Sequence, residues 1–314
     1  MIKKLTRGWK SPITEGMTSL KTARAVPILA LLLVQLIFGF NYAASKVILA
    51  VYPAVLWGGI RLGIAAVLMF ICAFIVVPKE ERRVDPSFLK HCFWYGLIGI
   101  AMNQAFFLLG LKYTTTTNAA ILNTLTPIFT LLFAILAGAE KFTYRRALGF
   151  LLAVMGALVI RPFEEFQITS NTFKGDLFTI LNCVSLALFF IISRKFLKQN
   201  SPFWATAWMF LFGAIVLLLA SISDFSQAIP SQINSTLLIA IFYNIVLATM
   251  VTYFLNSWTL TKVNPSSVAI FIYLQPVIAV LNAWLTGGEL PSTRVVIAMT
   301  LIFAGVGVGV LKKA

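Results

Sequence analysis

Charged residues are scarce in this chain of 314 residues. Only 11% of the residues are Asp, Glu, Lys or Arg, whereas 60% are hydrophobic and the mean hydropathy is +0.92. Soluble domains carry about 25% charged residues, so this composition excludes a soluble globular protein.

Histidine occurs once, and the three cysteines lie within or beside apolar segments. We therefore expect no disulfide framework, no metal site and no cofactor.

Acidic side chains are absent from the middle of every long apolar segment. An intramembrane enzyme would need paired carboxylates, a nucleophile with a base, or a metal cluster, so we expect no enzymatic activity. A proton relay normally needs a carboxylate at mid-span, and the sequence gives no sign of one. The glycines at 305, 307 and 309 lie inside an apolar helix with no preceding strand, which favours close helix packing over a dinucleotide site.

Long apolar runs dominate what is present, and they are apolar on every face, which is typical of membrane helices and not of β-barrels. We predict an all-α integral membrane protein with ten transmembrane helices. The expected spans are 27–50, 54–77, 91–111, 117–138, 144–161, 174–197, 203–222, 235–260, 265–288 and 292–311.

The basic residues punctuate these spans unevenly. With a cytoplasmic N-terminus, 19 Lys and Arg fall at inner segments, 5 fall at outer ends, and Arg61 lies within a span. This bias predicts that both termini are cytoplasmic. The net charge of +15 then reflects membrane topology, and we expect a lipid bilayer as partner and no nucleic acid.

An internal repeat appears when the chain is aligned with itself at an offset of 149 residues. Residues 118–161 then match residues 267–310 at 13 of 44 positions, among them Pro127 with Pro276 and Glu140 with Glu289. The interpretation is two five-helix repeats, 27–162 and 173–312, after a basic tail at 1–26. Because five is odd, the repeats must be inverted, which predicts alternating access around a central cavity.

Several motifs resemble one known family. Phe38-Gly39-Phe40-Asn41, Ser45-Lys46, Pro53 and Arg61 are similar to the first two helices of the EamA family in the drug/metabolite transporter superfamily. Pro127 with Gly138-Ala139-Glu140, and Gln275-Pro276 with Gly287-Gly288-Glu289, resemble its paired signatures. The resemblance covers roughly residues 27–311 and implies a ten-helix exporter of amino acids or related metabolites, without identifying the substrate.

Polar side chains near the middle of the spans are costly in hydrocarbon, so they are candidates for a solute path or for hydrogen bonds between helices. Thr249, Thr252 and Asn256 follow i, i+3, i+7 spacing with Tyr253 adjacent, which predicts a polar stripe. The candidate cavity residues are Asn41, Asn103, Gln104, Asn123, Thr126, Asn182, Thr252, Tyr253, Asn256, Tyr273 and Gln275.

Six further residues are candidates for other roles. Pro127 and Pro276 are mid-span breaks that can free backbone carbonyls for a solute or merely kink a helix. Arg61 and Lys46 can hold an anion, snorkel outward or bond to backbone carbonyls. Glu140 and Glu289, expected at the inner and outer surfaces respectively, are candidates for gating or for simple ion pairing.

The leading hypothesis is an alternating-access exporter of small organic solutes, most favourably amino acids, in the bacterial inner membrane. Tyr42, Phe106, Tyr253, Trp258 and Tyr273 are candidate aromatic contacts for apolar side chains. A carrier of sugar-phosphates or nucleotide-sugars is the alternative on the same fold, although such dianions would need more cavity cations than Arg61 and Lys46. A passive channel or a lipid-handling protein is the other alternative. No obligate protein partner is indicated.

Overall fold

The computed structural model describes residues 17–114, 119–120, 122–159, 170–228, 233–275, 277–278 and 293–310, and its regular elements there are all helical. The separate helices are α1 (Met17–Leu49), α2 (Ala54–Val76), η3 (Lys79–Glu81), α6 (Leu125–Leu136), α7 (Tyr144–Val159), α8 (Ser170–Gln199), α9 (Pro202–Ala220), η6 (Ile222–Gln227), α12 (Pro265–Ala269), η8 (Ile270–Tyr273) and α14 (Thr293–Val310). Two longer helices are each built from three consecutive segments. These are α3 (Pro86–Gly96), η4 (Leu97–Met102) and α4 (Asn103–Tyr113), and then α10 (Ser235–Phe242), η7 (Tyr243–Val251) and α11 (Thr252–Lys262).

The protein is an integral membrane protein built from helices. Within the described residues, six helices are long and apolar enough to cross a bilayer, and two shorter apolar helices accompany them. Large apolar side chains point outward from several of these helices, for example Val67, Ile75, Leu219 and Ile239. Such an apolar exterior suits contact with lipid chains and not with water.

The two three-part helices correspond closely. Pro86–Tyr113 and Ser235–Lys262 begin and end at the same offset of 149 residues. Each starts at a side-chain cap: Asp85 accepts from the Phe88 N–H at 2.9 Å, and Asn234 accepts from the Leu237 N–H at 2.8 Å. Each also contains a π-helical segment, η4 or η7, and these end at equivalent residues. Such π segments widen a helix locally and are frequent at functional sites.

Some predicted boundaries were wrong. Helix α1 extends back to Met17, because a membrane helix tolerates a proline such as Pro27, but its apolar membrane-spanning part, Ala25–Leu49, agrees with the predicted span 27–50. The third span begins at Pro86 and not at residue 91, because Asp85 caps it and a proline suits the first helical turn. The predicted ninth span starts as the short helix α12 and then tightens into the 3-10 segment η8.

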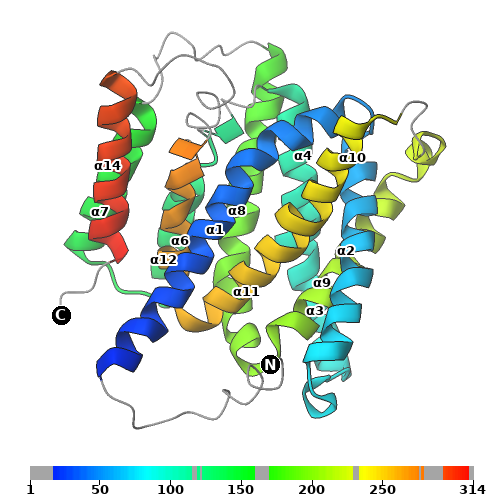
Figure 1. Ribbon diagram of the computed structural model, residues 1–314, viewed down its shortest axis with the longest axis horizontal. Helices are drawn as coiled ribbons and strands as arrows, with labels where there is room; N and C mark the ends of the chain where they lie inside the picture. The colour runs from blue at the N-terminus through cyan, green and yellow to red at the C-terminus, as the bar shows by residue number, and fades with distance from the viewer. Residues whose placement is uncertain are drawn as a thin grey trace.

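The helices pack in antiparallel pairs through small residues. A Cβ on Gly156 of α7 would meet the carbonyl of Ala298, and one on Gly305 of α14 would meet Ala153 N. Gly305 therefore allows close packing, as its sequence context predicted. Helices α7 and α14 lie together at one edge of the molecule, while α2 packs against α9 at the opposite edge (Figure 1). Helices α1, α4, α6, α8, α10, α11 and α12 lie between these two edges (Figure 1).

Candidate solute-binding cavity

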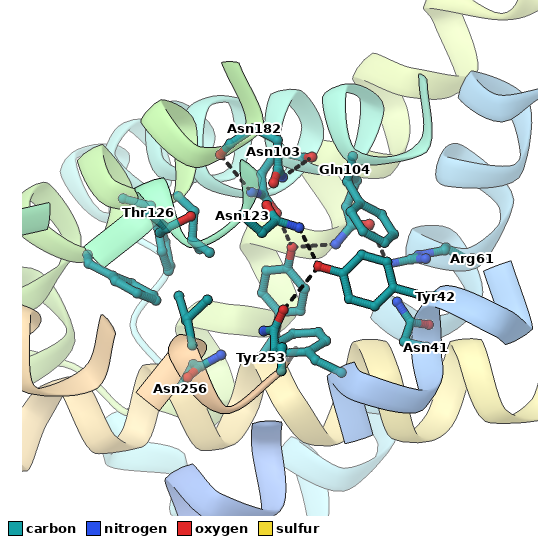
Figure 2. Close-up of a pocket in the computed structure, with 17 residues that line it drawn as sticks. Asn41, Tyr42, Arg61, Asn103, Gln104, Asn123, Thr126, Asn182, Tyr253 and Asn256 are labelled. Carbon is teal, nitrogen blue, oxygen red and sulfur yellow. Dashed lines mark hydrogen bonds between the residues drawn. The ribbon is translucent and has the colours of Figure 1, made fainter. Parts of the chain in front are cut away.

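A cavity lies at the centre of the molecule, between helices from both halves of the chain. Its wall combines amide, hydroxyl and aromatic side chains with one guanidinium (Figure 2). The lining residues are Phe38, Asn41, Tyr42, Arg61, Asn103, Gln104, Phe107, Asn123, Thr126, Asn182, Leu186, Phe189, Phe190, Tyr253, Asn256, Ile272 and Gln275.

Arg61 of α2 is the charged member of this wall, and only 1% of its surface is exposed. Its Nη1 donates to Asn244 Oδ1 at 2.8 Å, and its Nη2 donates to Gln104 Oε1. Asn244 also accepts from Trp57 Nε1 at 2.9 Å and donates to Asn41 Oδ1 at 2.7 Å. The buried guanidinium is thus solvated by neutral amides in place of water, which lowers the cost of removing its charge from water.

The hydrogen bonds continue from Gln104 into the second half of the chain. Gln104 Nε2 donates to the Tyr253 hydroxyl, which donates to Asn103 Oδ1 at 2.7 Å. Asn103 and Asn182 then bond each other's backbone carbonyls at 3.3 and 2.9 Å. These bonds join α2, α4, α8 and α11, so the polar wall also positions the helices that carry it.

A second relay crosses the other side of the cavity. Asn123 Nδ2 donates to the Tyr42 hydroxyl, which donates to Gln275 Oε1 at 3.1 Å. Gln275 Nε2 in turn donates to Gln35 Oε1 at 2.8 Å. Tyr42 and Gln35 both lie on α1, so this relay ties α1 to the segments on either side of it.

Many lining residues occupy equivalent positions in the two halves. The pairs at an offset of 149 residues are Asn41 with Phe190, Gln104 with Tyr253, Phe107 with Asn256, Asn123 with Ile272, and Thr126 with Gln275. In most of these pairs, one half has an amide side chain where the other half has an aromatic or aliphatic one. The two halves therefore contribute equivalent backbone positions to much of the wall, but the side chains at those positions differ in polarity.

Of the eleven candidate cavity residues, nine line the cavity and two do not. Thr252 Oγ1 donates to the Ala248 carbonyl at 2.9 Å, and Thr249 likewise bonds the Asn244 carbonyl. The expected polar stripe therefore does not line the cavity as a whole, because the short threonine side chains donate to carbonyls of their own helix. Tyr273 is fully buried against Phe150 and lies outside the cavity wall.

The candidate anion contacts also separate. Arg61 lines the cavity, whereas Lys46 lies outside its wall and donates from Nζ to the Thr114 carbonyl at 3.1 Å. Among the candidate aromatic contacts, Tyr42 and Tyr253 line the cavity, whereas Phe106 stacks on Phe178 outside the wall. Trp258 is not part of the wall either.

Glu140 lies at one end of the molecule, beyond α6, where Gly138 turns the chain with a φ of 65°. Its carboxylate pairs with Arg146 Nη1 at 2.7 Å and accepts from both the N–H and the hydroxyl of Ser266 at 3.1 and 2.5 Å. These bonds connect the segment between α6 and α7 to the start of α12. Pro127 is buried in the first turn of α6, while Pro276 and Glu289 lie outside the described residues.

Sequence reasoning missed several residues of the site. The aromatic residues Phe107 and Phe190 carry no signal in an apolar helix, although the repeat offset would have pointed to them from Asn256 and Asn41. Asn244 was missed as well. It is fully buried behind the wall and holds Arg61, and its position as an amide inside an apolar run was the available signal.

Two polar atoms of the wall are buried without a hydrogen-bond partner among the residues that the structure describes. These are Nε of Arg61 and Oδ1 of Asn256. Buried donors and acceptors are normally satisfied, so unpaired ones on a cavity wall are sites where a bound molecule can be held. In the described part of the chain, no group of three or more His, Cys, Asp or Glu side chains is arranged for a metal ion.

Comparisons with known proteins identify the family of this chain. The model of the EamA-like transporter family matches residues 25–161 and again residues 173–310. The chain therefore belongs to the EamA-like transporter family, within the drug/metabolite transporter superfamily.

Similar proteins come from bacteria, archaea and plants. The uncharacterized transporter YoaV of Bacillus subtilis is 24% identical over 280 residues, covering 89% of this chain and 94% of that protein. An uncharacterized transporter of Archaeoglobus fulgidus is 29% identical, over 74% of this chain and 80% of that protein. Protein WALLS ARE THIN 1 of Arabidopsis thaliana is 25% identical, over 84% and 75% respectively.

A solved crystal structure superposes on this protein with a TM-score of 0.73 and 18% sequence identity. The superposition covers 92% of this chain and 96% of the other. At this identity the likeness establishes a shared fold and leaves the substrate open.

Proposed function

We propose that the protein is an alternating-access transporter that exports small organic solutes, amino acids or related metabolites, across a bacterial inner membrane. The observation that carries the proposal is the buried cavity, whose wall includes five pairs of equivalent positions from the two halves of the chain. A central site shared by two similar halves is what alternating access requires, because each half can open the same site to one side.

The proposed architecture is ten transmembrane helices in two inverted repeats, 27–162 and 173–312, with both termini and the segment 1–26 on the cytoplasmic side. Supporting observations are the equal bounds, caps and π segments of the helices at 86–113 and 235–262. The antiparallel packing of α7 on α14 also supports it. In addition, the Met17 end of α1 and the Val310 end of α14 lie toward the same edge of the molecule (Figure 1).

We propose that Glu140 helps to close one end of the transport path by holding two segments of the chain together. Its bonds to Arg146 and Ser266 join segments from the two halves of the chain, α7 and α12. Opening that end would require these bonds to break. Glu289 at the equivalent position is proposed to serve the opposite end.

Counterflow in proteoliposomes tests the proposal. The purified protein would be reconstituted and assayed against a panel of amino acids, amines and sugar-phosphates. Saturable exchange of a small organic solute is expected. Saturable exchange of a phosphate ester with amino acids inert would replace the proposed substrate class, and flux that does not saturate would indicate a channel.

A further inference from the structure

The charge of the cavity wall is set by one residue. The other lining residues in the described part of the chain are neutral. The two groups that accept hydrogen bonds from Arg61 are the neutral amides of Asn244 and Gln104. The guanidinium has more N–H donors than these two bonds use, and Nε is buried without a partner among the described residues. A positive charge therefore faces the cavity with donor capacity to spare.

A carboxylate is the group that this arrangement fits. Carboxylates and guanidinium groups form short, charge-assisted hydrogen bonds, and in a cavity shielded from water such bonds are stronger than at a surface. A bound anion would also offset the uncompensated charge that Arg61 brings into the membrane interior. An ammonium group, in contrast, would raise the positive charge beside Arg61.

The wall offers an acceptor away from Arg61. Asn256 Oδ1 is buried and has no hydrogen-bond partner within the described part of the chain. Asn256 lies with Thr126 on the side of the cavity opposite Arg61, Asn41 and Tyr42 (Figure 2). An unpaired amide oxygen is satisfied by a donor such as a hydroxyl or N–H group of a bound molecule.

The wall also supplies aromatic surface. Phe38, Phe107, Phe189 and Phe190 all line the cavity. Aromatic rings bind apolar and planar groups through burial and edge or face contacts. The polar contacts with their aromatic surroundings therefore match a molecule with a carboxylate, an apolar body and a donor group away from the carboxylate.

We propose that the cavity selects amphipathic organic carboxylates with one net negative charge, binding the carboxylate at Arg61 and a distal hydrogen-bond donor at Asn256. This inference rests on the transport function proposed above. Within the small organic solutes named there, it favours related metabolites that carry a carboxylate over the amino acids themselves. Among solutes of similar shape, carboxylates without a free ammonium group bind better than zwitterionic amino acids, and amines bind least.

Three probes that share a phenylethyl group and differ in their charged groups test the charge selectivity. They are 3-phenylpropanoate, phenylalanine and 2-phenylethylamine, which are an anion, a zwitterion and a cation. Each is assayed by isothermal titration calorimetry on the purified wild-type protein and by counterflow in proteoliposomes. We expect 3-phenylpropanoate to bind about tenfold or more tightly than the other two. Equal or tighter binding of phenylalanine would overturn the proposal.

Variants at Arg61 test the assigned contact. Arg61→Gln is expected to abolish the preference for the anion, whereas Arg61→Lys keeps the charge and retains part of it. Lys90→Gln removes a charge from an exposed position of α3 and should leave the preference unchanged. If folded Arg61→Gln protein keeps the wild-type preference, the contact is wrong. If that variant does not fold, Arg61→Lys decides, because undiminished affinity there would contradict a contact through the guanidinium N–H groups.

Asn256 is tested with a hydroxylated probe. Asn256→Leu should weaken binding of 3-(4-hydroxyphenyl)propanoate about tenfold while affecting 3-phenylpropanoate less. Equal losses for both probes would contradict the proposed donor contact.

The two proposals fail in different ways. Tight binding of 3-phenylpropanoate without counterflow would support the charge selectivity and contradict transport. Saturable counterflow of phenylalanine with 3-phenylpropanoate inert would support transport and overturn the charge selectivity.

Discussion

Arg61 and Phe210 occupy equivalent positions in the two halves of the chain, on α2 and α9, yet their surroundings differ. Arg61 lines the cavity and bonds two amides, whereas Phe210 is fully buried outside the wall and packs edge-on against Tyr253 at 5.5 Å. The hydrogen-bonding groups around Arg61 are not repeated at the equivalent positions, where Thr206 matches Trp57, Phe190 matches Asn41, and Tyr95 matches Asn244. The halves share helix positions, but the amides that accept from Arg61 have no amide counterparts near Phe210.

This difference distinguishes residues that hold the helices together from residues that determine which molecules the cavity binds. The Phe210 side needs only packing, which tolerates apolar exchange. The position of Arg61 needs a set of hydrogen-bond acceptors, because a buried guanidinium is stable only where its N–H groups have partners. A single charged position can therefore give an otherwise symmetric cavity its selectivity.

The largest effect is expected from placing the charge on the wrong side. Phe210→Arg buries a guanidinium where no amide set is arranged to accept from it, and we expect destabilisation of about 3–5 kcal/mol or failure to fold. Phe210→Leu, the control, should lose about 1 kcal/mol. Thermal unfolding in detergent measures both, and a Phe210→Arg protein that melts with the wild type would contradict the asymmetry.

A smaller but still large effect is expected from removing the central acceptor. Asn244→Leu leaves both Arg61 Nη1 and Trp57 Nε1 without their partner, so we expect a loss of about 3 kcal/mol. Tyr95→Phe at the equivalent position should change stability by less than about 0.5 kcal/mol. Combining Asn244→Leu with Arg61→Leu should cost less than the sum of the two. Additive losses would show that the residues act independently.

A moderate effect on transport is expected on the cavity wall itself. Gln104→Ala and Asn256→Ala each remove a polar group that faces the cavity, so we expect transport to fall about tenfold while the protein still reaches the membrane. Thr300→Val on α14, whose hydroxyl bonds its own helix, is the control. If both cavity variants transport like the wild type, the assigned wall is not the solute path.

The smallest effects compare one pair of equivalent positions. Trp57→Phe removes the donor to Asn244 and should lose about 1 kcal/mol of stability. Thr206→Val removes a 3.2 Å contact to the Ser257 hydroxyl and should lose less than about 0.5 kcal/mol. Unfolding measured under the same conditions decides the order, and a larger loss for Thr206→Val would reverse the comparison.

Much of the helical framework was predictable because each apolar run has a length that the bilayer dictates. The predicted spans at 54–77 and 203–222 lie within two residues of α2 and α9. The start at Pro86 was missed, because the polar segment before residue 91 reads as a loop until Asp85 is seen as a cap. The turn at 123–124, which precedes α6, was missed because apolar residues surround it on both sides.

The site was partly predictable for a different reason. Asn103, Gln104 and Asn182 stand out because amides are rare in hydrocarbon. Their grouping required the packing of α4 on α8, and the same packing brought Phe189 to the wall without any sequence signal. Thr252 has a polar side chain too, but a carbonyl of its own helix satisfies it.

The helical, membrane-embedded character of the protein and its transporter family can be read from the chain alone, because apolar length and motif spacing are local properties. Which polar groups face the cavity, and which are satisfied elsewhere, follows from the packing of the helices. Hydrogen-bond satisfaction depends on neighbours far apart in sequence, as with Arg61 and Asn244, and no local pattern specifies which of them meet.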